Sequence, residues 1–148
     1  MREILFRGKR DYNGKWVEGS LLVWPDGSTE MCHTNPNSND ELLKVSVSPE
    51  TVGQYIGMKD RNGKMVFEGD IIELKGCRWG VGFENTAFAV MEGPSMQFAM
   101  FEQYRWDHKK REWVAPDYWE VVGNIYDNPE LLDVDGEGER RTDVPVTD

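Results

Sequence analysis

The stretch QYIGMKDRNGKMVFEGDII, residues 54 to 72, places an Asn-Gly pair and a Gly-Asp pair seven residues apart between apolar segments. Asn62-Gly63 is typical of a two-residue hairpin turn, because both residues tolerate the positive φ angles of a type I′ turn. Gly69 permits a bend, and we expect the Asp70 carboxylate to accept backbone N–H bonds there. We interpret the stretch as a hairpin followed by the strand Ile71-Ile72.

Metal binding by this stretch would require a different spacing of oxygen ligands. An EF-hand loop needs a glycine at position 6 and a bidentate glutamate at position 12. Counted from Asp60, Gly63 is the fourth residue and Ile71 the twelfth, so the calcium pattern fails. The cysteine and histidine side chains are Cys32, His33, Cys77 and His108. They lack the paired spacing of a structural zinc site, so we expect no metal and no cofactor.

A partial repeat of the stretch occurs earlier in the chain. Residues 11 to 22 match residues 60 to 72 in the pattern D-x-N-G-K followed by E-G, a polar residue and two aliphatics, with one gap opposite Phe67. Either the two segments derive from a duplication, or the same hairpin solution arose twice. A single pair does not decide between these origins, and a solenoid needs at least three repeats.

Short runs rich in Val, Ile, Tyr, Phe and Trp recur between clusters of Gly, Asn, Asp and Pro, and helical periodicity is poor throughout. This pattern predicts an all-β fold built from hairpins, with short helical turns. The expected strands are residues 4–7, 16–18, 21–24, 43–47, 71–75, 79–91, 97–106 and 112–126. Ser48-Pro49 and Asn128-Pro129 are expected to cap and open the helical turns. Residues 35 to 40 are expected to form a polar loop.

Length and composition limit the domain organisation. At 148 residues the chain is long enough for one domain with its own core, which we place at residues 1 to 132. Residues 133 to 148 lack aromatic, leucine and isoleucine side chains, so we expect a disordered acidic tail. Two widely spaced cysteines and the absence of an apolar leader favour the cytoplasm. The longest apolar run, residues 87 to 91, is too short to span a membrane.

The net charge of −10 bears on the partners of the chain. Residues 133 to 148 hold six acidic and two basic side chains, so the tail contributes −4 and the other 132 residues −6. Domains that bind nucleic acid through phosphates usually carry a basic excess. We therefore do not expect direct nucleic-acid binding, although a local basic patch stays open as an alternative.

Aromatic side chains crowd one expected hairpin around the basic turn Lys109-Lys110-Arg111. They are Tyr104, Trp106, Trp113, Tyr118 and Trp119. These side chains either form cross-strand pairs that close a small barrel or stand exposed as a surface for a protein or a ligand. Trp24 and Trp79 leave the same choice open. We take Tyr104, Trp106, Trp113 and Tyr118 as the candidate binding residues.

Four segments together have a recognisable pattern, and they occur in this order. They are REILFR at residues 2–7, GQYIGMKDRNGK at 53–64, EGDII at 68–72 and VGNIYDNPELL at 122–132. In these segments the chain resembles the YopX family of small phage and prophage proteins. The resemblance implies an SH3-like, partly open β-barrel in a bacterial host cytoplasm, with no catalytic residues to carry over. Residues 73 to 117 match no motif of the family, so we look for functional residues there.

The sequence as a whole leaves three classes of function open. We expect a non-catalytic accessory protein that binds a phage or host protein, a homo-oligomer being one form of such binding. The alternative is a regulator of nucleic-acid transactions, acting through a local basic patch or as an acidic mimic of nucleic acid. An enzyme is the third class, but no Gly-rich phosphate loop, G-x-S-x-G or H-E-x-x-H motif is present. Neighbours on a strand face opposite sides, so Cys32 and His33 would not share a proton.

Overall fold

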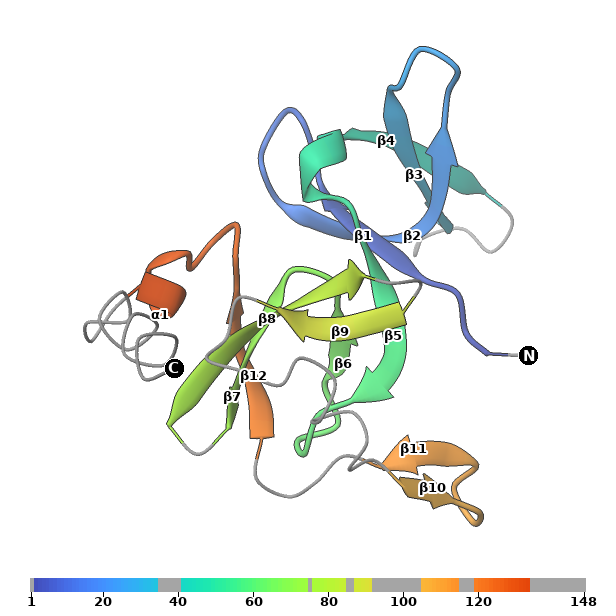
Figure 1. Cartoon of the computed structure of the whole chain (residues 1–148). Coiled ribbons are helices and arrows are strands. Elements are labelled where there is room, and N and C mark those ends of the chain that lie inside the picture. Colours follow the sequence, from blue (N-terminus) through green and yellow to red (C-terminus); the bar gives the residue numbers. More distant parts are fainter. Residues whose placement is uncertain are drawn as a thin grey trace. The chain divides into compact units, whose positions relative to one another are not determined.

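The computed structural model describes residues 2–34, 41–74, 76–84, 87–91, 105–114 and 119–133 (Figure 1). This part of the chain consists mainly of antiparallel strands, which confirms the predicted all-β class. The strands are β1 (Phe6–Lys9), β2 (Trp16–Val23), β3 (Thr29–Thr34), β4 (Leu42–Val47), β5 (Gly53–Lys59), β6 (Met65–Phe67), β7 (Asp70–Leu74), β8 (Cys77–Glu84), β9 (Ala87–Met91), β10 (Arg105–Asp107), β11 (Glu112–Val114) and β12 (Trp119–Asn124). The helical elements are the 3₁₀ turn η1 (Pro49–Thr51) and the short helix α1 (Glu130–Asp133).

The chain divides into two compact units, Met1–Tyr55 and Ile56–Asp148. The division falls inside β5, so this strand contributes residues to both units. The predicted polar loop at residues 35 to 40 lies outside the described residues, as do residues 97 to 104 of the predicted strand 97–106. Of the tail predicted at residues 133 to 148, only Asp133 is described, and it is the last residue of α1.

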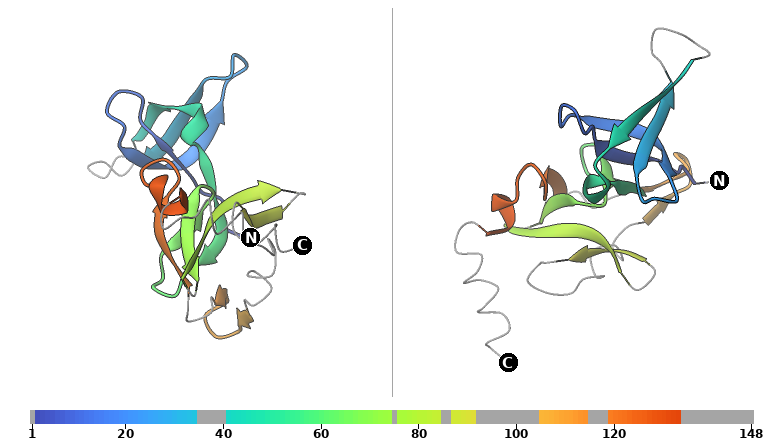
Figure 2. Two further views of the ribbon diagram at one scale, coloured as in Figure 1. Left: turned by 60° about the vertical axis from the view of Figure 1, so that its left-hand side comes forward. Right: turned by 90° about the horizontal axis from the view of Figure 1, so that it is seen from above.

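Antiparallel strands of the first unit follow the order β4, β3, β2, β1, and the start of β5 pairs with β1. The strands curl about a small core, and Figure 2 shows the strong twist of the β3 and β4 pair. The buried core residues are Val17, Met31 and Val47, with Phe6, Leu21 and Val52 packed against them. Gly8 keeps β1 close to this core, because a Cβ atom there would lie 3.2 Å from the Val47 Cβ.

The chain after β1 and the end of β4 meet at one place in this curled sheet. Arg10, after β1, forms an isolated antiparallel bridge with Val47 at the end of β4. Beside it the Ser48 N–H donates a hydrogen bond to the Lys9 carbonyl at 2.9 Å. Elsewhere in the described residues β1 pairs with β2 and β5, and β4 pairs with β3. The first unit is therefore an open, barrel-like curl that a single bridge closes in part.

The second unit contains a four-stranded antiparallel sheet in the order β12, β7, β8, β9 (Figure 1). The strand β6 lies next to β5, and β10 with β11 forms a separate two-stranded sheet. The buried core of the second unit comprises Ile56, Val66, Ile72, Trp79, Val81 and Val121, with Met58 and Cys77 packed against it. The sequence left Trp79 open between core and surface, and the structure places it in the core.

Two predicted strands are each divided in the structure, so their prediction as single strands was wrong. Residues 79–91 contribute to the β8 and β9 hairpin, in which Gly80 lies opposite Met91. The chain between Glu84 and Ala87 carries neither Gly nor Pro, so the sequence contains no strong signal for this reversal. Residues 112–126 divide into β11 and β12, which belong to different sheets.

Both predicted helical turns are present, but their side-chain caps differ from the prediction. The η1 turn follows Ser48 and begins with Pro49, yet the Ser48 hydroxyl donates to Asp11 Oδ1 at 2.9 Å instead of accepting a helix N–H. The α1 helix begins two residues after Asn128. The Asn128 side-chain oxygen accepts from the Asn124 N–H at 3.2 Å. The Ser48 side chain therefore binds the loop at Asp11, and the Asn128 side chain binds the end of β12.

The turn at Asn62-Gly63 is not the predicted type I′ turn. The Gly63 N–H donates to the Asp60 carbonyl at 2.9 Å, and the Asp60 N–H donates to the Lys64 carbonyl at 2.8 Å. Gly63 has φ +81°, whereas Asn62 does not have a positive φ. This pattern is typical of a three-residue loop that ends in one left-handed glycine. Of the two residues Asn62 and Gly63, only the glycine therefore adopts a left-handed conformation.

The partial repeat forms a longer loop. Here the Arg10 N–H donates to the Lys15 carbonyl and the Gly14 N–H to the Arg10 carbonyl, both at 2.9 Å. Gly14 is also left-handed, with φ +69°. The two D-x-N-G-K segments thus share a left-handed glycine but differ by one residue in loop length. The choice between duplication and independent origin stays open.

Candidate functional site

The loop that begins at Asp60 joins two distant parts of the second unit. The Asp60 carboxylate is 5% exposed and accepts three backbone hydrogen bonds. Its Oδ1 accepts from the N–H groups of Asn62 and Lys64, and its Oδ2 from the Val121 N–H, each at 2.9 Å. Backbone N–H groups of the fold therefore bind both oxygens of this carboxylate.

The same loop also binds the side chain of Glu120, the residue before Val121. Arg61 donates to Glu120 Oε1 at 2.9 Å, and Asn62 Nδ2 donates to Glu120 Oε2 at 3.0 Å. The loop side chains therefore bind β12 at two successive residues. No spacing in the sequence predicts these contacts, because 58 or more positions separate the partners.

The Gly69-Asp70 bend has the role predicted for it. Asp70 is 1% exposed and its Oδ2 accepts from the Phe67 N–H at 2.8 Å. Gly69 has φ +91°, and a Cβ atom there would lie 2.9 Å from Tyr126 Cε2. Its N–H donates to Val81, and its carbonyl accepts from the Ile125 N–H, both at 2.8 Å. The bend is therefore a structural junction.

The hairpin formed by β10 and β11 carries the candidate aromatic residues. Trp106 lies directly opposite Trp113 in the strand register. The Trp106 side chain is 40% exposed, whereas Tyr104 and Tyr118 lie outside the described residues. The structure thus brings two of the four candidates together in one cross-strand pair. Trp24, the other tryptophan left open by the sequence, is 45% exposed and donates from Nε1 to Glu30.

The turn of this hairpin is organised by Asp107. Its Oδ1 accepts from the Lys109 N–H at 2.9 Å and from the Lys110 N–H at 3.0 Å. The Arg111 N–H donates to the Asp107 carbonyl at 2.7 Å. Arg111 has φ +57°, a left-handed conformation that costs a residue with a Cβ atom about 1 kcal/mol. An arginine therefore occupies a position that glycine or asparagine would fill with less strain.

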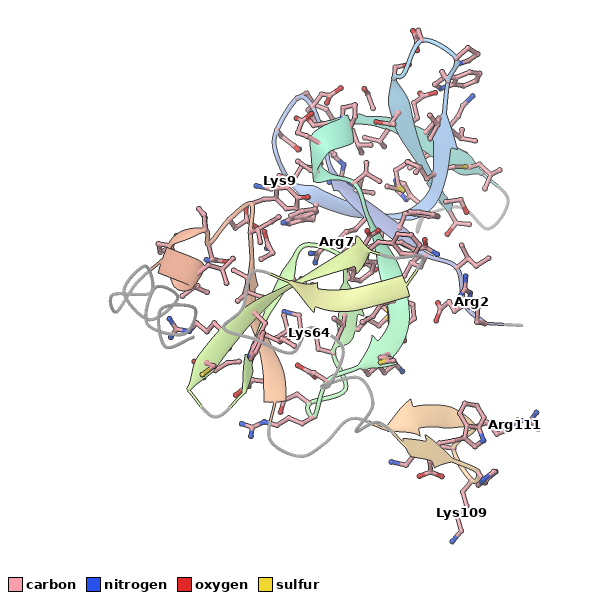
Figure 3. The ribbon with its side chains drawn as sticks, in the orientation of Figure 1. Arg2, Arg7, Lys9, Lys64, Lys109 and Arg111 are labelled. Atoms are coloured by element: carbon pink, nitrogen blue, oxygen red, sulfur yellow. The ribbon has the colours of Figure 1, made fainter. Side chains whose placement is uncertain are left out.

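Basic side chains surround the turn. His108, Lys109, Lys110 and Arg111 are all exposed, and Figure 3 shows Lys109 and Arg111 extending away from the hairpin. In the part of the chain that the structure describes, no ion pair joins Lys109, Lys110 or Arg111 to a carboxylate. The rings of Trp106 and His108 meet edge to face at 6.4 Å. These side chains line an open hollow of about 350 Å³ together with Asp107 and Lys109.

A second basic and aromatic group lies in the first unit. The Arg7 guanidinium lies 4.6 Å from the centre of the Trp16 ring, and the Lys9 ammonium lies 5.4 Å from it (Figure 3). Lys9 pairs with Trp16 in the strand register. Arg7 is 9% exposed, so burial and the aromatic ring hold this cation in place. This arrangement stabilises β1 against β2, and sequence reasoning had not singled it out.

Titratable groups with shifted pKa values are found on turns of the first unit. Hydrogen bonds from the Ser46 and Ser48 hydroxyls lower the pKa of the Asp11 carboxyl. Hydrogen bonds from the hydroxyl and the N–H of Ser28 lower the pKa of Asp26 in the same way. Both carboxylates therefore accept hydrogen bonds that fasten loops of the first unit.

The candidate metal-ligating and thiol side chains lie apart in the described residues. They contain no group of three or more His, Cys, Asp or Glu side chains that could hold a metal ion. Cys32 and Cys77 are both free and half-buried. Cys32 and His33 are successive residues of β3, so their side chains lie on opposite faces of the strand. Among described residues no helix has the length and apolar character needed to cross a membrane.

These features define an all-β protein of two hairpin-built units, whose buried aspartates fasten the loops and whose exposed basic hairpin carries a tryptophan. The chain belongs to the YopX protein family, whose model matches residues 5–133. This match confirms the resemblance drawn from the four sequence segments. The fold is also similar to the crystal structure of protein EF1440 from Enterococcus faecalis, with 20% identity and a TM-score of 0.53. That similarity covers 89% of this chain and 99% of the other. No curated protein matches the sequence.

Proposed function

We propose that this chain is a non-catalytic phage or prophage accessory protein that binds a partner protein in the bacterial cytoplasm. The observation that carries the proposal is the exposed Trp106 beside the exposed basic turn of the β10 and β11 hairpin. Tryptophan and arginine are the residues most often found at the energetic centre of protein interfaces. The partner is a phage protein, a host protein or a second copy of this chain.

The arrangement of the acidic groups supports binding over catalysis. The buried carboxylates of Asp60 and Asp70 accept backbone hydrogen bonds, and so they serve the fold. A general acid or base needs a carboxyl group that can reach a substrate. The exposed hairpin offers cations and an aromatic ring, which suit recognition of a partner surface.

A pull-down from lysate of the host bacterium tests the hairpin as the binding surface. The bait is the full chain, compared with Trp106→Ala and Trp113→Ala. Trp24→Ala is the matched control, because Trp24 is an exposed tryptophan on another hairpin. We expect the wild type and Trp24→Ala to retain the same partner and Trp106→Ala to lose it. A partner retained equally by the wild type and both hairpin variants would contradict the proposal.

Nucleic-acid regulation is the second candidate, favoured by the same basic turn Lys109-Lys110-Arg111. Direct contact with phosphates would release counterions, so binding would weaken steeply as salt increases. Mobility shifts with duplex and single-stranded DNA at low and high salt test this version. Binding that is salt-sensitive and lost in Lys109→Ala/Lys110→Ala would favour it. An acidic mimic of nucleic acid would instead bind a DNA-binding protein and give no shift with DNA alone.

A further inference from the structure

We infer that the β10 and β11 hairpin recognises a short acidic segment of its partner, one with an apolar side chain flanked by carboxylates. This inference rests on the proposed function and names the chemistry of the partner. The charge of the hairpin, the hydrogen bonds of its turn and the hollow beside Trp106 support it.

The charge of the hairpin is opposite to that of the rest of the chain. Residues 105 to 114 carry four basic and two acidic side chains, which gives +2. The remaining residues therefore sum to −12, because the whole chain has −10. Exposed charges farther away than about 8 Å are largely screened at physiological salt. A short acidic ligand confined to the hairpin is thus affected mainly by the positive charge of residues 105 to 114.

The hydrogen bonds of the turn leave recognition to its side chains. The N–H groups of Lys109 and Lys110 already donate to Asp107 Oδ1, and the Arg111 N–H donates to the Asp107 carbonyl. An incoming carboxylate would therefore meet the two ammonium groups and the guanidinium. Arginine can bind a carboxylate through two parallel hydrogen bonds. Asp107 opposes such a ligand, but its Oδ1 is held by the turn.

The hollow beside Trp106 offers room for an apolar group of the ligand. Its volume of about 350 Å³ lies at the low end of the range for ligand sites. Trp106 and His108 supply ring surface on its wall, and Lys109 supplies a cation. An aliphatic or aromatic side chain of a peptide would bury apolar area there, while flanking carboxylates reach the basic groups.

A long polyanion fits the charge distribution less well than a short peptide. Double-stranded DNA carries one negative charge per about 1.7 Å of its axis. The residues outside 105–114 sum to −12, so a duplex longer than the hairpin would be repelled wherever its phosphates came near them. The observations therefore favour the peptide, and nucleic acid becomes an outcome of the test.

The test uses fluorescence anisotropy with the full chain and three labelled probes. The first is a peptide of glutamate and aspartate residues around one central leucine, the second has lysine in place of every acid, and the third is a short oligothymidylate. Each is titrated at about 50 mM and about 200 mM salt, a range over which charge-driven binding changes strongly. We expect the acidic peptide alone to bind, and to bind at least tenfold more weakly at the higher salt.

The variants separate local recognition from general electrostatics. Lys109→Glu/Lys110→Glu should weaken binding of the acidic peptide at least tenfold, and Lys109→Arg/Lys110→Arg should preserve it. Trp106→Ala should weaken it severalfold at both salt concentrations. Lys15→Glu is the control, because Lys15 is an exposed lysine on another hairpin turn, and it should leave binding unchanged. Circular dichroism spectra of all variants verify that the chain stays folded.

Three results would overturn the inference. They are no binding of the acidic peptide at millimolar concentration, equal loss in Lys15→Glu, and tighter binding of the oligothymidylate than of the peptide. If the peptide fails while a partner protein still depends on Trp106, the hairpin remains the binding surface and only the acidic chemistry is wrong. If partner binding is also independent of Trp106, the proposed function fails as well.

Discussion

The buried carboxylate of Asp60 accepts a hydrogen bond from the backbone N–H of Val121, 61 positions farther along the chain. Two further N–H groups, those of Asn62 and Lys64, bind its other oxygen. One side chain thereby shapes the loop between β5 and β6 and fixes that loop to β12.

Asp60→Asn should lower the free energy of unfolding by about 2 to 3 kcal/mol, because an amide NH₂ group would face backbone donors in a buried site. Urea unfolding measures this loss. Asp26→Asn is the control, since Asp26 is an exposed acceptor in a loop of the first unit, and it should destabilise the protein clearly less than Asp60→Asn. Equal effects of the two substitutions would contradict the role assigned to Asp60.

Gly69→Ala should destabilise the protein more than Gly63→Ala. Both glycines are left-handed, so either alanine costs about 1 kcal/mol in backbone strain. At Gly69 the added Cβ would also lie 2.9 Å from Tyr126, whereas at Gly63 it meets no atom within 4 Å. Thermal unfolding of the two variants under identical conditions checks the order. A larger loss for Gly63→Ala would show that the contact with Tyr126 is readily relieved.

Asp11 should make the first unit more sensitive to acid. Hydrogen bonds from Ser46 and Ser48 put the folded-state pKa of Asp11 below 3.8, its ordinary value. The unfolded chain therefore binds this proton more readily, so the contribution of Asp11 is present above pH 3.8 and is lost as pH falls through the folded-state pKa. The difference in stability between the wild type and Asp11→Asn should accordingly shrink between pH 5 and pH 2. A difference that stays constant over this range would argue against it.

Arg111→Gly should separate the stability of the hairpin from its binding. Glycine relieves the strain at φ +57°, so the turn should be retained or stabilised by up to about 1 kcal/mol. Loss of the guanidinium should weaken binding of the acidic peptide severalfold. Hydrogen exchange of the hairpin amides and the anisotropy titration measure the two effects. A variant that binds the peptide as tightly as the wild type would remove Arg111 from the binding surface.

The all-β class could be predicted because it depends on local patterns. Short apolar runs between Gly, Asn, Asp and Pro clusters located most hairpins, including the turn at residues 107 to 111. The type of turn at Asn62-Gly63 could not be predicted with equal success. Asn-Gly suits several loops, and the carboxylate of Asp60 stabilises the three-residue form through bonds to Asn62 and Lys64.

The residues of the candidate site could be located, but their surroundings could not. The order of the residues located the aromatic side chains around Lys109-Lys110-Arg111, yet no local pattern shows whether Trp106 is exposed in the folded chain. The left-handed Arg111 had no signal, because a residue with a Cβ atom is rarely expected in that conformation. Burial of Asp60 and Asp70 was likewise hidden, since charged side chains are usually assigned to the surface.

The sheet order β12, β7, β8, β9 also has a consequence for the synthesis of the protein. All strand pairs of the first unit up to Tyr55 can form once those residues have left the ribosome. In the second unit β7 can pair with β8 early, but its other edge must wait for β12, and Asp60 stays without the Val121 N–H until that late strand emerges. In nascent chains halted before residue 119, the first unit should therefore resist protease, whereas the second unit should still be cleaved. Folding during translation would then proceed in two separate stages.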